Sequence, residues 1–248
     1  MPKLGILRQA ARACLLAGAL CAGPAALAAS LQISPVIINL APGERATTIR
    51  LENTGMEPIY GQVRVFAWSQ RDGQDALEPT QAIVASPPLL QIPPRSSQIV
   101  RLLQAGDLPA GEQSFRMLID EIAPPGQAPR TGVDVRLRYS VPIFAGAQTA
   151  QPVAQALTWS LVREGDALRL QLHNAGPHRA QVSQVVLESA GRRYAYEPGL
   201  LGYALADSTR RWPLPDGFPA SAAGGAVQIQ AVVNTVATRA PVGAAPQR

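Results

Sequence analysis

The feature of this sequence that most constrains its fold is a long alternation of apolar and polar residues between Thr131 and Phe144. Successive side chains of a β-strand point to opposite faces, so this alternation predicts a strand with one apolar face. That face would carry Val133, Val135, Leu137, Tyr139, Val141 and Ile143. Strands in globular proteins are usually about five or six residues long. We therefore expect this one to do more than fill its own core, and to offer an apolar face to another protein.

Short apolar stretches separated by turn residues recur along the rest of the chain and predict an all-β fold. About seven such stretches precede residue 145, with the spacing of an immunoglobulin-like sandwich. The stretch 83–92 is interrupted by Pro87 and Pro88, which predicts an edge strand or a strand that changes sheets. A second set of stretches begins at Val153 and predicts a second, smaller sandwich.

The first 28 residues have the pattern of a secretory signal peptide. A basic start is followed by a short apolar stretch and by Ala26-Leu27-Ala28, a small-residue cleavage site. Both cysteines, Cys14 and Cys21, lie inside this segment, so we expect an exported mature chain without a disulfide.

The sequence therefore predicts five segments along the chain. They are a signal peptide (1–28), an N-terminal sandwich (29–145), a linker (146–152), a C-terminal sandwich (153–237) and a flexible tail (238–248).

The charge of the mature chain does not indicate a nucleic-acid or membrane partner. The chain has 22 basic and 17 acidic residues, and three of the basic ones lie in the signal peptide, which leaves a net charge of about +2. The apolar stretch of the signal peptide is too short and too broken to cross a bilayer as a helix, so we expect no membrane insertion.

The residues that could support chemistry do not form a catalytic pattern. No nucleophile elbow, phosphate-binding loop or dinucleotide-binding glycine pattern occurs. Asp120 and Glu121 are adjacent in a predicted strand, so their carboxylates would face opposite ways. His173 and His178 flank a turn with no cysteine or carboxylate cluster nearby, and we interpret them as water-exposed. We expect no enzyme, no metal site and no cofactor.

Arg116 is the charged residue with the clearest candidate role. It shares a predicted strand face with Leu118 and Ile122, beside the long strand. It is either an edge arginine with its head in solvent or an anchor that binds a partner's carboxylate bidentately, through two parallel N–H···O bonds. The tryptophans Trp68, Trp159 and Trp212 are expected in the cores or at the seam between domains.

Several motifs in fixed order resemble the periplasmic pilus-assembly chaperones of the PapD-like, chaperone–usher family. The resemblance covers nearly the whole mature chain. The motifs are Ser86-Pro-Pro88, Ser97 to Leu102, Glu112 to Ile122, Pro124-Pro125, Asn174-Ala-Gly176 and Leu201 to Trp212.

This resemblance implies two immunoglobulin-like sandwiches set as an L, in a periplasmic protein. It implies that the last strand of the first domain completes a pilin subunit that lacks its own final strand, a mode of recognition by strand addition. The partners would be pilin or fimbrial subunits and an outer-membrane usher. The donor residues would be Val133, Val135, Leu137, Tyr139 and Val141.

The sequence departs from this family at the anchor for the subunit's terminal carboxylate. Members use an arginine on the first strand and a lysine near the end of the donor strand, and the matching positions here hold Ile37 and Pro142. The chain thus resembles the divergent archaic or sigma-type branch. Arg116 is the replacement anchor that we predict, with Arg138 as the second candidate.

Two other functions stay open at this point. One is a secreted two-domain β-sandwich adhesin or carbohydrate-binding protein, although aromatic residues for stacking on sugars make up only 5% of the chain. The other is a pilus subunit, which would have a single sandwich and an alternating N-terminal extension.

Overall fold

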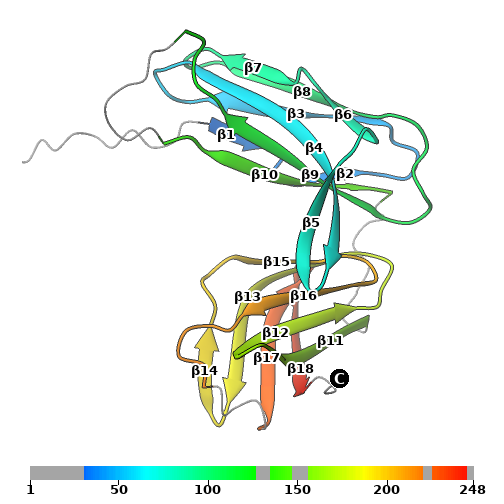
Figure 1. Ribbon diagram of the computed structural model, residues 1–248, viewed down its shortest axis with the longest axis vertical. Coiled ribbons are helices and arrows are strands. Elements are labelled where there is room, and N and C mark those ends of the chain that lie inside the picture. Colours follow the sequence, from blue (N-terminus) through cyan, green and yellow to red (C-terminus); the bar gives the residue numbers. More distant parts are fainter. Residues whose placement is uncertain (1–30, 127–134, 147–155, 220–224, 245–248) are drawn as a thin grey trace, which may run out of the picture.

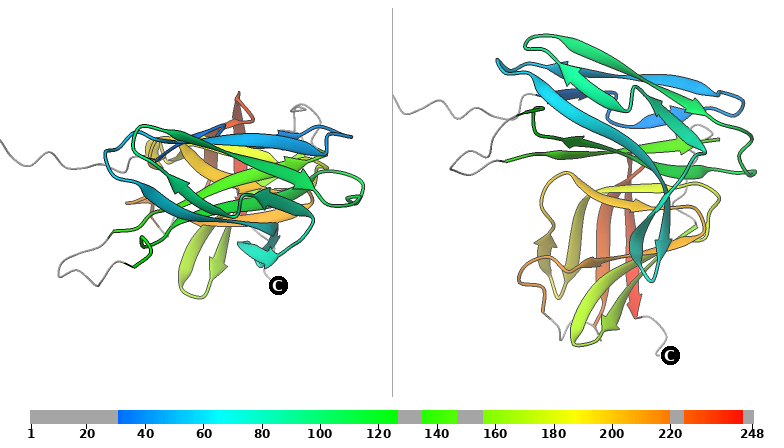
Figure 2. Two further views of the ribbon diagram at one scale, coloured as in Figure 1. Left: turned by 90° about the horizontal axis from the view of Figure 1, so that it is seen from above. Right: turned by 45° about the horizontal axis from the view of Figure 1, so that its top comes forward.

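The computed structural model describes residues 31–126, 135–146, 156–219 and 225–244, which form two β-sandwiches (Figure 1). The predicted signal peptide, the donor residue Val133 and most of the predicted linker lie outside these residues. The sandwiches meet at an angle, as two arms of an L (Figures 1 and 2). The expected all-β fold with two immunoglobulin-like sandwiches is confirmed.

The first sandwich packs a four-stranded sheet on a six-stranded one. The four-stranded sheet has the order β1 (Leu31–Ser34), β3 (Ala46–Asn53), β8 (Ser97–Gln104), β6 (Ile83–Ser86). The six-stranded sheet has the order β2 (Ile38–Leu40), β10 (Arg138–Ala145), β9 (Gln113–Glu121), β4 (Ile59–Arg71), β5 (Gln74–Pro79), with β7 (Leu89–Ile92) also paired to β4. The alternating apolar residues of both sheets fill the space between them and form one core.

The segment around Pro87 and Pro88 changes sheets, as one of the two sequence interpretations predicted. β6 precedes the two prolines and pairs with β8, whereas β7 follows them and pairs with β4 in the opposite sheet. A proline has no N–H to donate to a strand ladder, so the ladder is interrupted where the chain crosses over.

The second sandwich contains the remaining eight strands. They are β11 (Leu157–Glu164), β12 (Ala167–Asn174), β13 (Ala180–Ser189), β14 (Arg192–Ala195), β15 (Leu200–Ala204), β16 (Ser208–Pro213), β17 (Val227–Val233) and β18 (Val236–Ala244). Trp159 and Trp212 lie in its core, in agreement with the sequence prediction. The predicted flexible tail from residue 238 is wrong as far as Ala244, because β18 pairs with β17 and then with β11.

Both sandwiches end a strand in the same way, with a fully buried asparagine. Asn53 at the end of β3 and Asn174 at the end of β12 each donate to three backbone carbonyls. In each, Oδ1 accepts the N–H of the glycine two residues later, Gly55 or Gly176. An asparagine can thus replace the strand ladder where the chain turns away.

The hairpin of β4 and β5 extends from the first sandwich across to the second (Figures 1 and 2). At its tip the backbone carbonyl of Gly73 accepts the N–H of Arg211 at 2.8 Å. Gly73 has a φ of +77°, and a Cβ there would lie 2.6 Å from Cγ of Arg211, so only glycine fits this contact. The hairpin thereby joins the two sandwiches.

Candidate functional site

An aromatic cluster built by both domains forms the seam between the sandwiches. Trp68 on β4 and Phe144 on β10 come from the first, and Tyr203 on β15 comes from the second. The three ring centroids lie 5.6 to 5.9 Å apart, and Ile37 and Leu205 pack beside them. Trp68 therefore occupies the seam, one of the two places expected from the sequence.

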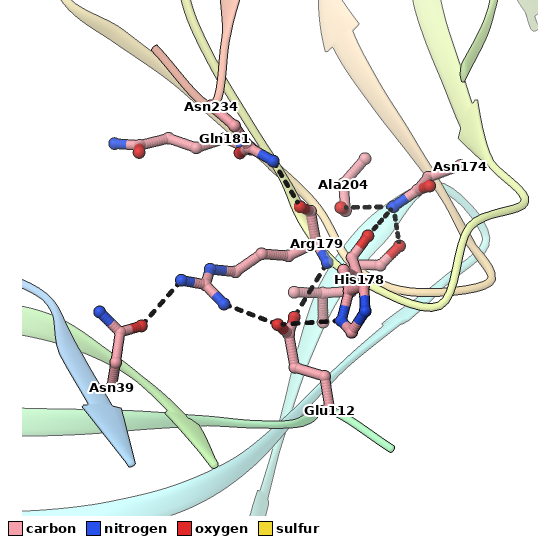
Figure 3. A network of polar contacts seen from close by, with 9 residues as sticks. Asn39, Glu112, Asn174, His178, Arg179, Gln181, Ala204 and Asn234 are labelled. Carbon is pink, nitrogen blue, oxygen red and sulfur yellow. Dashed lines mark hydrogen bonds and ion pairs between the residues drawn. The ribbon is translucent and has the colours of Figure 1, made fainter. Parts of the chain in front are cut away.

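One face of this cluster carries Arg179, whose guanidinium carbon lies 3.7 Å from the centroid of Phe144. Arg179 lies just before β13, and its Nη1 donates to Glu112 Oε2 at 2.6 Å while its backbone N–H donates to Glu112 Oε1 at 2.9 Å (Figure 3). Its Nη2 donates to Asn39 on β2 at 2.7 Å. The Glu112 side chain is only 1% exposed, so a buried ion pair links the two domains here.

His178 lies against the same carboxylate. Its Nδ1 is buried, 3.9 Å from Glu112 Oε2, and makes no hydrogen bond (Figure 3). The interpretation of both histidines as water-exposed holds only in part for His178, whose side chain is 21% exposed but whose Nδ1 is buried at the seam. His173 is exposed, and its Nδ1 lies 3.1 Å from the hydroxyl of Thr209.

Arg116 on β9 makes the corresponding stack on Trp68, with its guanidinium carbon 3.7 Å from the ring centroid. The same guanidinium carbon lies 5.7 Å from the centroid of the Tyr203 ring. Burial lowers the pKa of Arg116 below its ordinary value, while the nearby Asp75 carboxylate acts in the opposite direction. Among the described residues, its guanidinium has no hydrogen bond and no ion pair. The structure places this arginine in the seam rather than with its head in open solvent.

Ile37 and Pro142, which hold the usual anchor positions, both lie at or next to the seam. Ile37 packs on the aromatic cluster, and Pro142 is the direct cross-strand partner of Arg116. One of the positions that lack the family's usual basic residues, Pro142, thus lies directly opposite an arginine supplied by a neighbouring strand.

The end of β10 nearest the seam is covered on both edges, and its other end is not. β9 pairs with all of β10, whereas β2 pairs with only Ile143 to Ala145. Within the described residues, the edge from Arg138 to Pro142 therefore has no strand beside it. An uncovered edge can accept a strand from another chain.

The alternating apolar row changes its surroundings along the chain. Val141 is 4% exposed and belongs to the core of the first sandwich, and Tyr139 packs at the margin of that core. Leu137 is half-buried, and Val135 is 72% exposed. The prediction of one strand from residue 133 is wrong for 135–137, because β10 begins at Arg138.

Asp120 and Glu121 hold the first residues of β10 from opposite faces, as their adjacency predicted. Asp120 accepts hydrogen bonds from Arg138 and, at 2.7 Å, from Arg64. Glu121 lies 3.4 Å from both the Leu137 N–H and the Tyr139 hydroxyl, and burial together with this carboxylate raises the pKa of Tyr139 to about 12.

The two candidate anchors are not brought together. Arg138 pairs with Asp120, and Arg116 lies opposite Pro142 four residues further along β10. At about 3.3 Å per residue the two positions are roughly 13 Å apart. The Arg138 guanidinium is already held by a carboxylate, so Arg116 is the better candidate.

Sequence reasoning missed Arg179, Asp75 and the stacking role of Trp68. None of them interrupts an apolar alternation. Arg179 also lies 67 residues from its partner Glu112 in the sequence. The Arg179 contact depends on the packing of one domain on the other, whereas the contacts of Trp68 with Asp75 and Arg116 depend on packing within the first sandwich.

Neither a metal site nor a membrane span appears in the part of the chain that the structure describes. No group of three or more histidine, cysteine, aspartate or glutamate residues is suitably placed there to hold a metal ion. No helix in the same residues is long and apolar enough to cross a bilayer.

A family comparison and a structure comparison both match this chain to pilus-assembly chaperones. Residues 30–147 match the family described as pili and flagellar-assembly chaperone, PapD N-terminal domain. No curated protein sequence matches the chain significantly.

Solved pilus chaperones have similar structures. A chain of the CsuC–CsuE chaperone–tip adhesion subunit complex, from the archaic Csu pili of Acinetobacter baumannii, is 26% identical with a TM-score of 0.66, over 88% of this chain and all of the other. The YadV chaperone is 20% identical with a TM-score of 0.61, over 86% and 99% of the two chains. A chain of the Salmonella enterica SafA–SafB pilin–chaperone complex is 16% identical with a TM-score of 0.57, over 88% of this chain and 97% of the other.

Proposed function

Because this chain is a PapD-like chaperone of the chaperone–usher pathway, we propose that it holds its pilus subunit through the uncovered edge of β10 and through Arg116. The protein binds and stabilises pilus subunits by donor-strand complementation and delivers them to an outer-membrane usher. The comparisons do not favour the adhesin or carbohydrate-binding alternative. The observation that carries the site is the pairing of β10 on one edge only between Arg138 and Pro142.

The donor face is the outer part of the alternating row. Val141 and Ile143 fill the chaperone's own core, which fixes the direction in which the earlier residues of the row point. Val135 and Leu137 extend this row beyond the core, and Val133 continues it in sequence. Each aliphatic side chain that a subunit groove fully buries contributes about 1.5–3 kcal/mol before the costs of association. Tyr139 and Val141 then serve to connect the donor face to the domain.

Arg116 is the proposed anchor for the subunit's terminal carboxylate. Its guanidinium carbon lies 3.7 Å from the centroid of the Trp68 ring and no carboxylate of the described residues is bound to it, so its N–H groups remain able to bind one. Partial burial strengthens such a charge-assisted bond, because fewer water molecules compete for it. The aromatic platform also limits the rotamers of the arginine, which reduces the entropy lost on binding.

We also propose a localisation, the absence of catalysis and a branch of the family for this chain. Chaperones of this family are periplasmic, and we extend this to export of this chain with cleavage after Ala28. The family acts without catalysis, and we expect the same here. We also place the chain in the archaic branch, on its likeness to the Csu chaperone complex and on the shifted anchor.

The donor face is tested by replacing Val135 and Leu137 together with aspartate. Both lie outside the core, so the variant should fold normally, yet the yield of a complex with a co-expressed pilus subunit should fall at least tenfold. Leu200→Asp is the matched control, since Leu200 is a similarly exposed apolar residue, 55% exposed, on the second sandwich. Equal yields for the wild type and the double variant would place the donor face elsewhere.

The anchor is tested with a subunit's C-terminal peptide, made with a free or an amidated terminus. Arg116→Ala should weaken binding of the free peptide at least tenfold, because a desolvated charge pair is worth about 2–5 kcal/mol on truncation. Arg116→Lys should restore it only in part, because an ammonium lacks the planar fork. Arg239→Ala serves as the control, because Arg239 is an exposed arginine paired with Glu188 on the second sandwich. If amidation costs the wild type and Arg116→Ala equally, another group holds the carboxylate.

A further inference from the structure

Asp75, the second residue of β5, lies at the edge of the Trp68 platform. Its Oδ1 accepts the indole Nε1–H of Trp68 at 3.0 Å and the amide of Gln70 at 2.9 Å. The same indole carries the Arg116 guanidinium on its face. The carboxylate is thus fixed in place beside the proposed anchor, and its electrostatic attraction partly offsets the effect of burial on the pKa of Arg116.

Arg210 of the second sandwich is the ion-pair partner of Asp75. Its Nη2 lies 3.5 Å from Asp75 Oδ2. Its Nη1 donates at 2.8 Å both to the Gly73 carbonyl and to the Gln74 side chain at the tip of the hairpin. Arg210 is therefore held against the β4–β5 hairpin by neutral acceptors as well as by charge.

Two of the arginines at the seam have a carboxylate partner among the described residues, and Arg116 does not. Arg179 pairs with Glu112, and Arg210 pairs with Asp75. Arg116 remains without a carboxylate of its own, although Asp75 lies close enough to attract it. Any anion that binds Arg116 must enter a field to which Asp75 contributes repulsion and Arg210 contributes attraction.

We propose that Asp75 competes with the subunit's terminal carboxylate for Arg116, and that Arg210, across the seam, limits this competition. This inference rests on the proposed role of Arg116 as the anchor. Asp75 and Arg210 act through Arg116, so they are positioning residues rather than direct ligands. The weakened anchor lets a bound subunit leave, which a carrier that must hand over its cargo requires.

The two residues should have opposite effects on binding. Asp75→Asn removes the competing charge but keeps an oxygen that accepts from Trp68 and Gln70, so the affinity for a carboxylate should rise about three- to tenfold. Arg210→Gln leaves Asp75 without its partner, so the affinity should fall by a similar factor. Arg210→Lys keeps the charge and should restore most of the loss. A purely structural role would weaken binding in every variant.

The experiment uses the whole mature chain, labelled with ¹⁵N, and follows the Arg116 Nε–H and the Trp68 indole N–H by NMR. The probe is N-acetylglycine, which has the terminal carboxylate of a chain, and its amide is the uncharged control. We expect the acid alone to shift both signals, with an affinity highest in Asp75→Asn, intermediate in the wild type and lowest in Arg210→Gln.

Failure of this inference differs from failure of the anchor. If N-acetylglycine shifts neither signal in any variant, the anchor itself is wrong, and this inference with it. If the acid binds but Asp75→Asn and Arg210→Gln leave its affinity unchanged or lower it together, only the competition is wrong. Should Asp75→Asn not fold, the comparison of Arg210→Gln with Arg210→Lys decides, since equal affinities for these two would contradict the proposal.

Discussion

Two arginines at the same seam, Arg116 and Arg179, make the same aromatic contact but have different charge partners. Each guanidinium lies 3.7 Å from the centroid of a ring, Trp68 or Phe144, in one continuous aromatic cluster. Arg179 is bound by the buried carboxylate of Glu112 from the other domain. Arg116 has no such bond within the described residues.

We interpret this difference as one between a structural arginine and the proposed binding one. A cation–π contact contributes about 0.5–2 kcal/mol and leaves the edge of the guanidinium available. A buried ion pair uses that edge, and removing one partner leaves the other as an uncompensated charge. We therefore expect Arg179 to hold the domains together and Arg116 to remain available for a ligand.

The largest expected effect is on stability, from Glu112→Ala. The change leaves Arg179 with a buried charge and two lost hydrogen bonds, so the free energy of unfolding should fall by about 3–5 kcal/mol. Urea unfolding followed by tryptophan fluorescence measures it. Glu78→Ala is the control, because Glu78 pairs with Arg71 at 2.7 Å on the surface and should cost less than about 1 kcal/mol. A similar loss for both variants would mean that Glu112 does not stabilise the seam.

A smaller effect is expected when the two arginines are truncated in turn. Arg179→Ala should lower the free energy of unfolding by about 2–4 kcal/mol, because Glu112 stays buried without its partner. Arg116→Ala should lower it by less than about 2 kcal/mol, because it loses only stacking. Thermal and urea unfolding of the two variants side by side give the difference. If Arg116→Ala were the more damaging, the distinction between the two arginines would fail.

The smallest expected effect on stability concerns Asp120. Its single carboxylate pairs with two arginines, Arg64 and Arg138. Burial would raise the pKa of Asp120, but hydrogen bonds from Arg138 and Arg64 outweigh it and hold this pKa below the ordinary 3.8. A lowered pKa in the folded state stabilises the protein above the unfolded-state pKa, and this is lost as the pH falls through the folded-state pKa.

Asp120→Asn should therefore cost less than about 1 kcal/mol at neutral pH, since both arginines are well exposed. The wild type and the variant should converge in stability as the pH falls below about 3.8. Unfolding in urea between pH 7 and pH 2.5 checks this. A gap that persists at the lowest pH would show that the carboxylate's charge is not the cause.

Much of the fold could be predicted because it follows from local patterns. The change of sheet at Pro87 and Pro88 was one of two options, and the missing N–H groups explain why a ladder stops there. β18 was missed because its first residues, Val236 to Ala240, are small and moderately polar and carry little apolar signal. The start of β10 was placed too early, since alternation is a property of the side chains and pairing requires a neighbouring strand.

The sequence by itself determined the apolar row that leads into β10 and the two sandwiches, and it proposed Arg116 as the anchor because Ile37 and Pro142 replace the basic residues of the family. The row and the sandwiches follow from periodicity, which each strand carries by itself, whereas the anchor proposal follows from the resemblance to the family. Only the tertiary structure decided which part of the row stays outside the core and which arginine has a carboxylate. Glu112 and Arg179 are 67 residues apart, and Asp75 and Arg210 also come from different domains. Charge pairing depends on distance in space, and the docking of one domain on the other sets that distance.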